Sequence, residues 1–173
     1  MKTLVFILLI SWLFPLFAFS QSNVRMSAGF GYPSGIHLSS IYHEKAFQFE
    51  FVFGLPAVAH DMDRGYYWNL NLGVRFGKEE NKAQVKPWII RLGPSFYQVE
   101  DKWEIERKSL LFASLGREFN FTSRLGCELM IGPTIIMSEK TTVKEEKPSS
   151  WLGNILEDEI PITEGRVMIF YRF

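Results

Sequence analysis

His37 and Ser39 have the residue types and the spacing that nucleophilic catalysis uses. Residues two apart in an extended strand lie on the same face, so the imidazole could act as general base for the serine hydroxyl. A serine hydrolase also needs a third group that orients the histidine. The surrounding alternation points both side chains inward, so the alternative is a polar pair in the interior of the fold.

Two further candidates carry weaker chemistry. His60, Asp61 and Asp63 could contact a divalent cation, which prefers oxygen ligands, but two carboxylates are few for a dedicated site and a solvated loop is the favoured interpretation. Cys127 is the single cysteine, so it has no internal disulfide partner and is interpreted as a small buried apolar residue. The sequence therefore predicts no catalytic, cofactor or metal site.

The segment 45–55, KAFQFEFVFGL, has two chemically different faces. Side chains alternate across a strand with period two. One face therefore presents a row of aromatic and aliphatic side chains, namely Phe47, Phe49, Phe51, Phe53 and Leu55. The other face carries Gln48, Glu50, Val52 and Gly54. This segment is predicted to be a strand between two different environments.

The same alternation recurs in eight segments, an even number as in single-chain bacterial barrels. They cover residues 24–32, 36–42, 45–55, 66–76, 85–97, 108–119 and 125–137, and a last strand that ends at Phe173. Odd-numbered connections are expected on the outside, and three of them, residues 56–65, 98–107 and 138–160, are predicted to be long. Pro94 lacks an amide proton and predicts a bulge or a locally broken ladder. The prediction is all-β: an eight-stranded antiparallel up-and-down β-barrel.

The direction of the two faces separates a transmembrane barrel from a soluble barrel of the lipocalin kind. The interior of an eight-stranded barrel is just wide enough for side chains to fill. Large apolar residues dominate one face, and the other carries Gly29, Gly31, Gly54, Gly73, Gly93, Gly116, Gly126 and Gly132. Small residues belong where space is short, and rows of glycine are unusual on a water-facing strand. The apolar face is therefore expected to meet lipid.

Charged residues on the inner face need partners, because a lone buried charge costs several kcal/mol. The inward set is Arg25, Glu50, Arg75, Arg91, Glu118, Glu128, Arg166 and Arg172. These side chains are predicted to pair and to plug the lumen. The alternative is a narrow conducting pore lined by arginine.

Residues 1–20 contain Lys2, an apolar run and the small residues Ala18 and Ser20 before Gln21. This pattern predicts a cleaved signal peptide, with an uncleaved anchor as the alternative, and leaves residues 21–173 as the barrel. Later segments lack the roughly 18 apolar residues that a spanning helix needs.

Charge and aromatic content limit the function further. The chain has 19 basic and 19 acidic residues, and loss of Lys2 leaves a net charge near −1, so nucleic acid is not an expected partner. Four aromatic residues are expected at the two membrane interfaces, which aromatic girdles mark in barrels: Tyr32, Trp68, Trp88 and Tyr171.

The pattern, with the stretch GREFNFTSRLGCELMIGPTI at residues 116–135, resembles small outer-membrane barrels of the OmpX and OmpA transmembrane-domain type, particularly those of Bacteroidetes. The last strand, with Tyr171 and Phe173, resembles the assembly signal of that group. The resemblance implies a Gram-negative outer-membrane location, contact with lipid and lipopolysaccharide, insertion by the barrel assembly machinery, and a monomer. It also implies a non-enzymatic surface or envelope role through extracellular loops.

The runner-up function rests on a second resemblance. His37 and Ser39 resemble the His-x-Ser pair of the lipid A deacylase PagL, which would make the protein a lipid A-modifying hydrolase. That family places the pair near the end of the chain, whereas here it lies in the second predicted strand.

Overall fold

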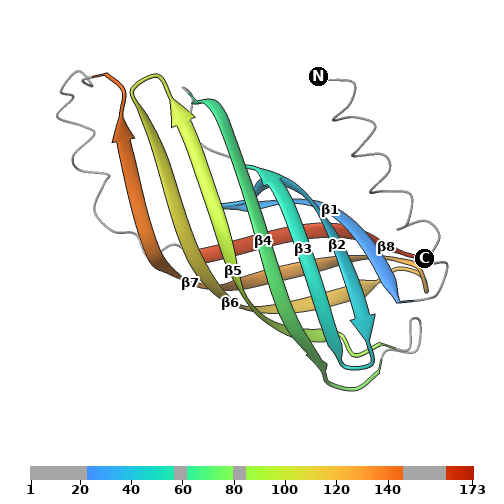
Figure 1. Cartoon of the computed structure of the whole chain (residues 1–173). Helices are drawn as coiled ribbons and strands as arrows, with labels where there is room; N and C mark the ends of the chain where they lie inside the picture. Colours follow the sequence, from blue (N-terminus) through green and yellow to red (C-terminus); the bar gives the residue numbers. More distant parts are fainter. Residues whose placement is uncertain (1–22, 57–61, 80–84, 146–162) are drawn as a thin grey trace.

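The computed structural model describes residues 23–56, 62–79, 85–145 and 163–173, which form a closed antiparallel barrel of eight strands (Figure 1). Each strand pairs with the next along the chain, and β1 pairs with β8 to close the cylinder. The strands are β1 (Val24–Tyr32), β2 (Gly35–Glu44), β3 (Phe47–Leu55), β4 (Met62–Phe76), β5 (Trp88–Asp101), β6 (Glu104–Asn120), β7 (Leu125–Val143) and β8 (Thr163–Arg172). The predicted all-β up-and-down barrel is confirmed.

Helical segments do not contribute to the described barrel. The predicted signal peptide, residues 1–20, lies outside the described residues. Within the described part of the chain, no helix has the length and apolarity needed to cross a membrane.

The prediction of a charged loop at residues 98–107 is wrong. β5 continues to Asp101 and β6 begins at Glu104, so only Lys102 and Trp103 form the turn. The Asp101 carboxylate closes this turn by accepting hydrogen bonds from the backbone amides of Trp103 at 2.7 Å and Glu104 at 2.6 Å. The two strands extend through this polar segment because side chains on one strand pair with side chains opposite them on the other. One example is the 2.8 Å hydrogen bond from Arg107 on β6 to Gln98 on β5.

The other two predicted long connections are also shorter than expected. β4 begins at Met62, inside the predicted loop 56–65, and β7 continues to Val143, inside the predicted loop 138–160. A bulge at Met137, between the pairs Leu110–Ile136 and Ser109–Ser138, shifts the register of β7 and hides the period-two pattern. Residues 146–162 lie outside the described part of the chain.

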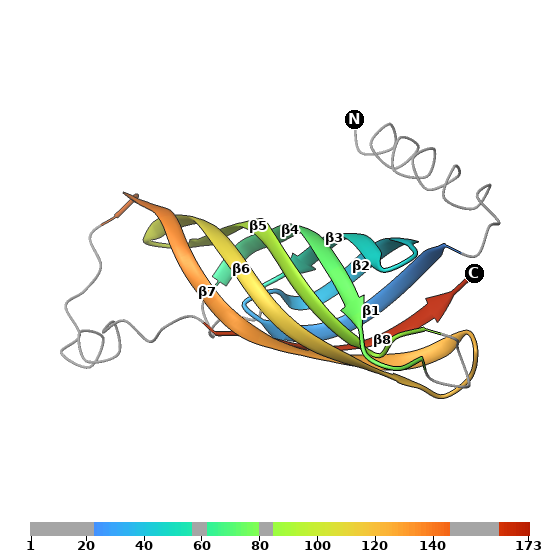
Figure 2. The same ribbon diagram turned by 90° about the horizontal axis from the view of Figure 1, so that it is seen from below.

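The two walls of the barrel differ in height (Figures 1 and 2). β4 to β7 have 14 to 19 residues each, whereas β1, β2, β3 and β8 have 9 or 10. We call the end with the turns after Glu44, Phe76 and Asn120 the terminal end, because β1 starts and β8 finishes there. The opposite end is the hairpin end, where β5, β6 and β7 project beyond the shorter wall.

Gly-Pro steps interrupt two of the ladders. The β4–β5 pairing is absent between Leu72–Leu92 and Asn69–Ser95, beside Gly93 and Pro94, which confirms the predicted break. Residues 132 and 133, also Gly-Pro, lie at a similar interruption between β6 and β7. A Cβ atom on Gly93 would overlap the carbonyl oxygen of Leu70 and lie 2.8 Å from Cα of Asn71. The glycine therefore allows a close backbone approach where the proline cannot donate a hydrogen bond.

We expect Gly93→Ala to destabilise the barrel by about 1–3 kcal/mol, because the added methyl group must displace the β4 backbone. Gly165→Ala is the matched control, since no atom lies within 4 Å of a Cβ built there. Urea unfolding followed by tryptophan fluorescence measures both. Equal effects of the two substitutions would contradict the close approach.

Candidate functional site

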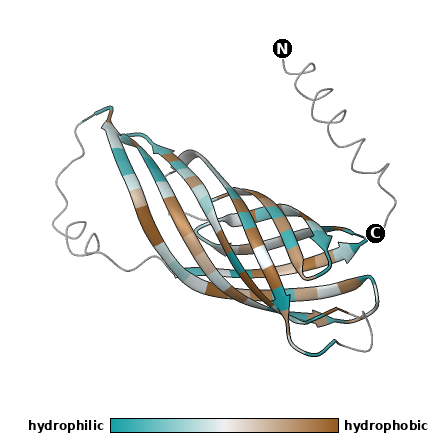
Figure 3. Ribbon diagram, turned by 60° about the horizontal axis from the view of Figure 1, so that its bottom comes forward, coloured by the Kyte–Doolittle hydropathy of each residue, from teal (hydrophilic) through white to brown (hydrophobic). Residues whose placement is uncertain are grey.

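The candidate site is the lumen, which receives every second side chain of each strand. Along β3 the apolar residues Phe49 and Phe51 are exposed on the outer surface, whereas Glu50 between them is completely buried. Hydrophobic and hydrophilic residues alternate along the strands in the same way (Figure 3). The barrel thus has an apolar outside and a largely polar inside.

Glu118 is the centre of the charges at the terminal end of the lumen. Its carboxylate accepts hydrogen bonds from both Nη atoms of Arg75, one of them at 2.9 Å, from Arg25 Nη1, and from Arg172 Nη2 at 2.5 Å. Three guanidinium groups on β1, β4 and β8 therefore share one carboxylate on β6. Charge-assisted pairs of this kind are among the strongest hydrogen bonds in proteins.

Two further carboxylates extend the series of ion pairs toward the hairpin end. Glu128 binds Arg25 Nη2 at 2.5 Å and Arg91 Nη1 at 2.5 Å. Glu50 lies 3.3 Å from both Arg91 Nη1 and Arg166 Nη2, and it accepts a 2.8 Å hydrogen bond from an amide side chain, that of Asn71. These ion pairs, with those of Glu118, connect seven of the eight strands.

The structure places all eight inward-assigned charged residues inside the barrel and in contact through ion pairs. Glu164 was missed: it is buried and lies 2.7 Å from Arg166 Nε. The period-two pattern of β8, followed back from Arg166, identifies it as an inward residue. Together with Glu50, Glu118 and Glu128 it provides four carboxylates for five guanidinium groups.

An apolar cluster fills the lumen toward the hairpin end. It consists of Val52, Tyr67, Tyr97, Val99, Leu110 and Phe112, all buried. The rings of Tyr67 and Phe112 meet edge to face, with their centroids 6.3 Å apart. The sequence did not indicate this cluster, because Val99 lies in a segment interpreted as loop and the apolar residues of β6 were assigned mainly to the outer face.

His37 and Ser39 lie inside the barrel but engage other residues. His37 Nδ1 is 3.0 Å from Ser34 Oγ and 3.1 Å from the carbonyl oxygen of Gly35. Ser39 Oγ is hydrogen-bonded to Ser27 Oγ on β1. Both side chains are almost completely buried. The imidazole is therefore positioned by the β1–β2 turn rather than directed at the serine.

The other candidates give no site in the described part of the chain. His60 and Asp61 lie outside the described residues, and the side chain of Asp63 is not described. Among the described residues no group of three His, Cys, Asp or Glu side chains could hold a metal ion. Cys127 is a free, half-buried thiol.

The four aromatic residues expected at membrane interfaces fall into two groups. Tyr32 ends β1 at the hairpin end, and Trp68 stacks on Phe96 with ring centroids 5.8 Å apart. Toward the terminal end, the guanidinium carbon of Arg117 lies over the ring of Trp88, 5.1 Å from the ring centroid. At the end of β8 a separate pair, Tyr171 and Phe173, has its centroids 5.3 Å apart.

Comparison with solved structures identifies a similar fold in the N-terminal β-barrel domain of Pseudomonas aeruginosa OprF. The two superpose with a TM-score of 0.57 over 88% of this chain and 98% of that domain, at 13% sequence identity. The likeness at this identity concerns the fold alone. No known protein family and no curated protein matches the sequence.

We expect Glu118→Gln to lower the free energy of unfolding by about 3–5 kcal/mol, because it leaves three guanidinium groups without their shared carboxylate. Glu139→Gln is the control: Glu139 pairs with Lys108 at 3.2 Å but is half exposed, so its loss is expected to cost less than about 1 kcal/mol. Urea unfolding of both variants against the parent provides the comparison. A similar small loss for both would show that the lumen pairs contribute no more than surface ones.

Proposed function

We propose that this protein is an integral outer-membrane β-barrel of a Gram-negative bacterium with a non-enzymatic surface or envelope role. The observation that carries the proposal is the closed apolar belt around an ionic interior, since a water-soluble barrel would reverse these faces. Export would use a signal peptide in residues 1–20, and Tyr171 and Phe173 would form the signal read by the barrel assembly machinery.

The height of the belt supports a membrane-spanning role. Outward apolar side chains extend over residues 66–76 in β4, 88–96 in β5 and 125–135 in β7. A tilted transmembrane strand needs about 9–11 residues. Further toward the hairpin end the outer faces also carry polar side chains, such as Gln98 on β5 and Lys140 on β7. Lipid and lipopolysaccharide would surround the belt.

The projecting part of β5, β6 and β7 supports a surface role. It presents cross-strand polar pairs, such as Lys144 with Glu100 at 2.7 Å and Arg107 with Gln98 at 2.8 Å. Paired side chains on strands hold a fixed shape, so this part of the barrel would offer a preformed recognition surface outside the membrane. The protein would act there as a monomer.

The filled lumen favours a closed barrel over a narrow pore. The arginines that would line such a pore are held by carboxylates, and the cluster around Tyr67 and Phe112 occupies the hairpin side. Small barrels are generally filled in this way. We therefore assign no transport role.

We expect Phe51→Arg to destabilise the protein in lipid bilayers by about 2–4 kcal/mol, because Phe51 is exposed at the middle of β3 and an arginine there would face acyl chains. Phe121→Arg is the control, since Phe121 is also exposed but lies in the turn after β6, where about 0–1 kcal/mol is expected. Urea unfolding from liposomes measures both. Residues 21–173 remaining a compact monomer in buffer without detergent would contradict the membrane assignment.

The non-enzymatic assignment has its own test, aimed at the hydrolase alternative. We expect the mass spectrum of lipid A to be the same in cells with and without the gene, because His37 is hydrogen-bonded within the β1–β2 turn and Ser39 is hydrogen-bonded to Ser27. Loss of an acyl chain that depends on the gene and disappears in His37→Ala would establish the hydrolase instead.

A further inference from the structure

The terminal end of the lumen has more positive than negative charge. Glu118 is shared by Arg25, Arg75 and Arg172, and of these only Arg25 has a second carboxylate partner among the described residues, Glu128. Arg172 is partly exposed at the mouth. In a low-dielectric interior such an excess of guanidinium groups favours a bound counter-anion.

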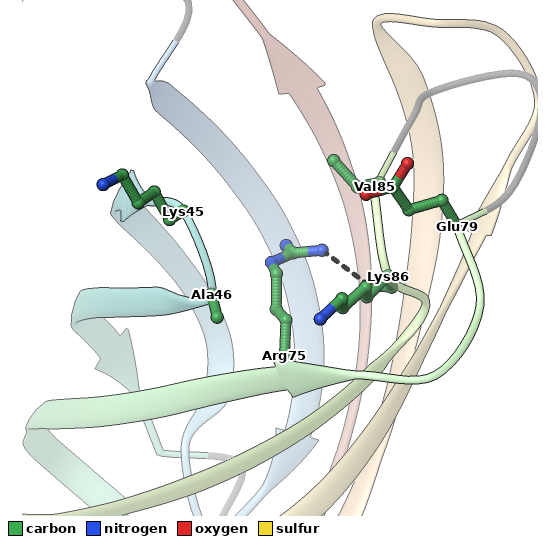
Figure 4. A pocket seen from close by; sticks show the side chains of 6 residues that line it. All are labelled: Lys45, Ala46, Arg75, Glu79, Val85 and Lys86. Carbon is green, nitrogen blue, oxygen red and sulfur yellow. Dashed lines mark hydrogen bonds between the residues drawn. The ribbon is translucent and has the colours of Figure 1, made fainter.

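A cavity of about 350 Å³ opens at this mouth, lined by Lys45, Ala46, Arg75, Glu79, Val85 and Lys86 (Figure 4). The Lys86 side chain points toward Arg75, so two cationic groups face the same space. Arg75 is almost completely buried and is held in place by Glu118 and by the carbonyl oxygen of Lys86, 3.2 Å from Arg75 Nη1. The guanidinium is therefore a preorganised wall of the cavity.

The turn between β2 and β3 forms the opposite wall. Its carbonyl at Ala46 accepts a 2.7 Å hydrogen bond from the amide of Arg75, which fixes the turn against β4. Lys45 stands on this rim, while Glu79 stands on the rim near Val85 and is the acidic group in the lining. On the inward face of β2 at this end, both ring nitrogens of His43 are buried and lack a hydrogen-bond partner among the described residues.

We propose that this mouth binds a phosphate group, with Arg75 and Lys86 as its main contacts and Lys45 at the rim. Arginine and lysine are the side chains that bind phosphate in proteins. The cavity has room for a phosphate and an attached group, because a water molecule occupies about 30 Å³ in the liquid. The phosphate could be free in solution or belong to an anionic lipid headgroup. The site is additional to the proposed envelope role, and binding to the isolated folded barrel does not depend on that role.

The test is titration of the folded protein in zwitterionic detergent micelles with inorganic phosphate, at constant ionic strength set by chloride. The amide NMR signals of Ala46 and Lys86 report on the cavity. We expect saturable shifts of these signals and a Kd that rises at least about tenfold in Lys86→Gln, since a charge-assisted contact is lost. Lys140→Gln, at the hairpin end, is the matched charge control and should leave the Kd unchanged.

Glu79→Gln extends the test in the opposite direction, because it removes an acidic group from the rim. We expect tighter phosphate binding in this variant, a gain that damage to the fold would not produce. A second arm compares nanodiscs of phosphatidylglycerol with nanodiscs of phosphatidylcholine. Shifts that appear with phosphatidylglycerol and are reversed by inorganic phosphate identify a lipid headgroup as the ligand, whereas shifts with inorganic phosphate alone identify the free anion.

Two results would overturn the proposal. One is the absence of saturable shifts at Ala46 and Lys86 in both arms. The other is an equal Kd in the parent protein, Lys86→Gln and Lys140→Gln, which would show that phosphate acts through general electrostatics rather than through this cavity.

Discussion

The fold depends on the pairing of guanidinium and carboxylate groups inside a cylinder too narrow to hydrate them. A buried charge without a partner costs several kcal/mol, so each residue of the lumen network must meet its counterpart. Glu118 joins β6 to β1, β4 and β8, and Glu128 joins β7 to β1 and β5. A shift of one strand by one residue would carry its charges to the apolar face and break several pairs together. These ion pairs therefore specify the register of the seven strands that they join.

Room for these long side chains comes from the glycines of neighbouring strands. A Cβ atom on Gly31 would lie 2.7 Å from Cγ of Arg166, and one on Gly73 would lie 3.0 Å from Cγ of Arg91. The same strands place Phe30 and Leu72 on the outside. One alternating pattern thus achieves two results, because small residues inside make space for arginine while large ones outside form the apolar belt.

Strict period-two alternation made much of the barrel predictable from the sequence, and the predictions failed where that alternation breaks. β1 begins at Val24 and ends at Tyr32 as expected, and the eight charged residues assigned to the inner face lie inside the barrel, although Glu164 was missed. The bulge at Met137 exchanges the inward and outward positions along the rest of β7, so the sequence beyond it lost the expected alternation and was predicted to be a loop. Which carboxylate meets which arginine could not be predicted either, because Glu118 and Arg25 are 93 residues apart and their contact depends on barrel closure.

The two ends of the cylinder consequently differ in chemistry. Toward the hairpin end the apolar cluster around Tyr67 and Phe112 separates the ionic network from the projecting strands, so a ligand arriving there meets paired polar side chains on β5 to β7. At the terminal end no comparable cluster covers Arg75 in the described part of the lumen, and a cavity reaches the guanidinium directly. In the roles proposed for the two ends, recognition would depend on shape at the hairpin end and on charge at the terminal end.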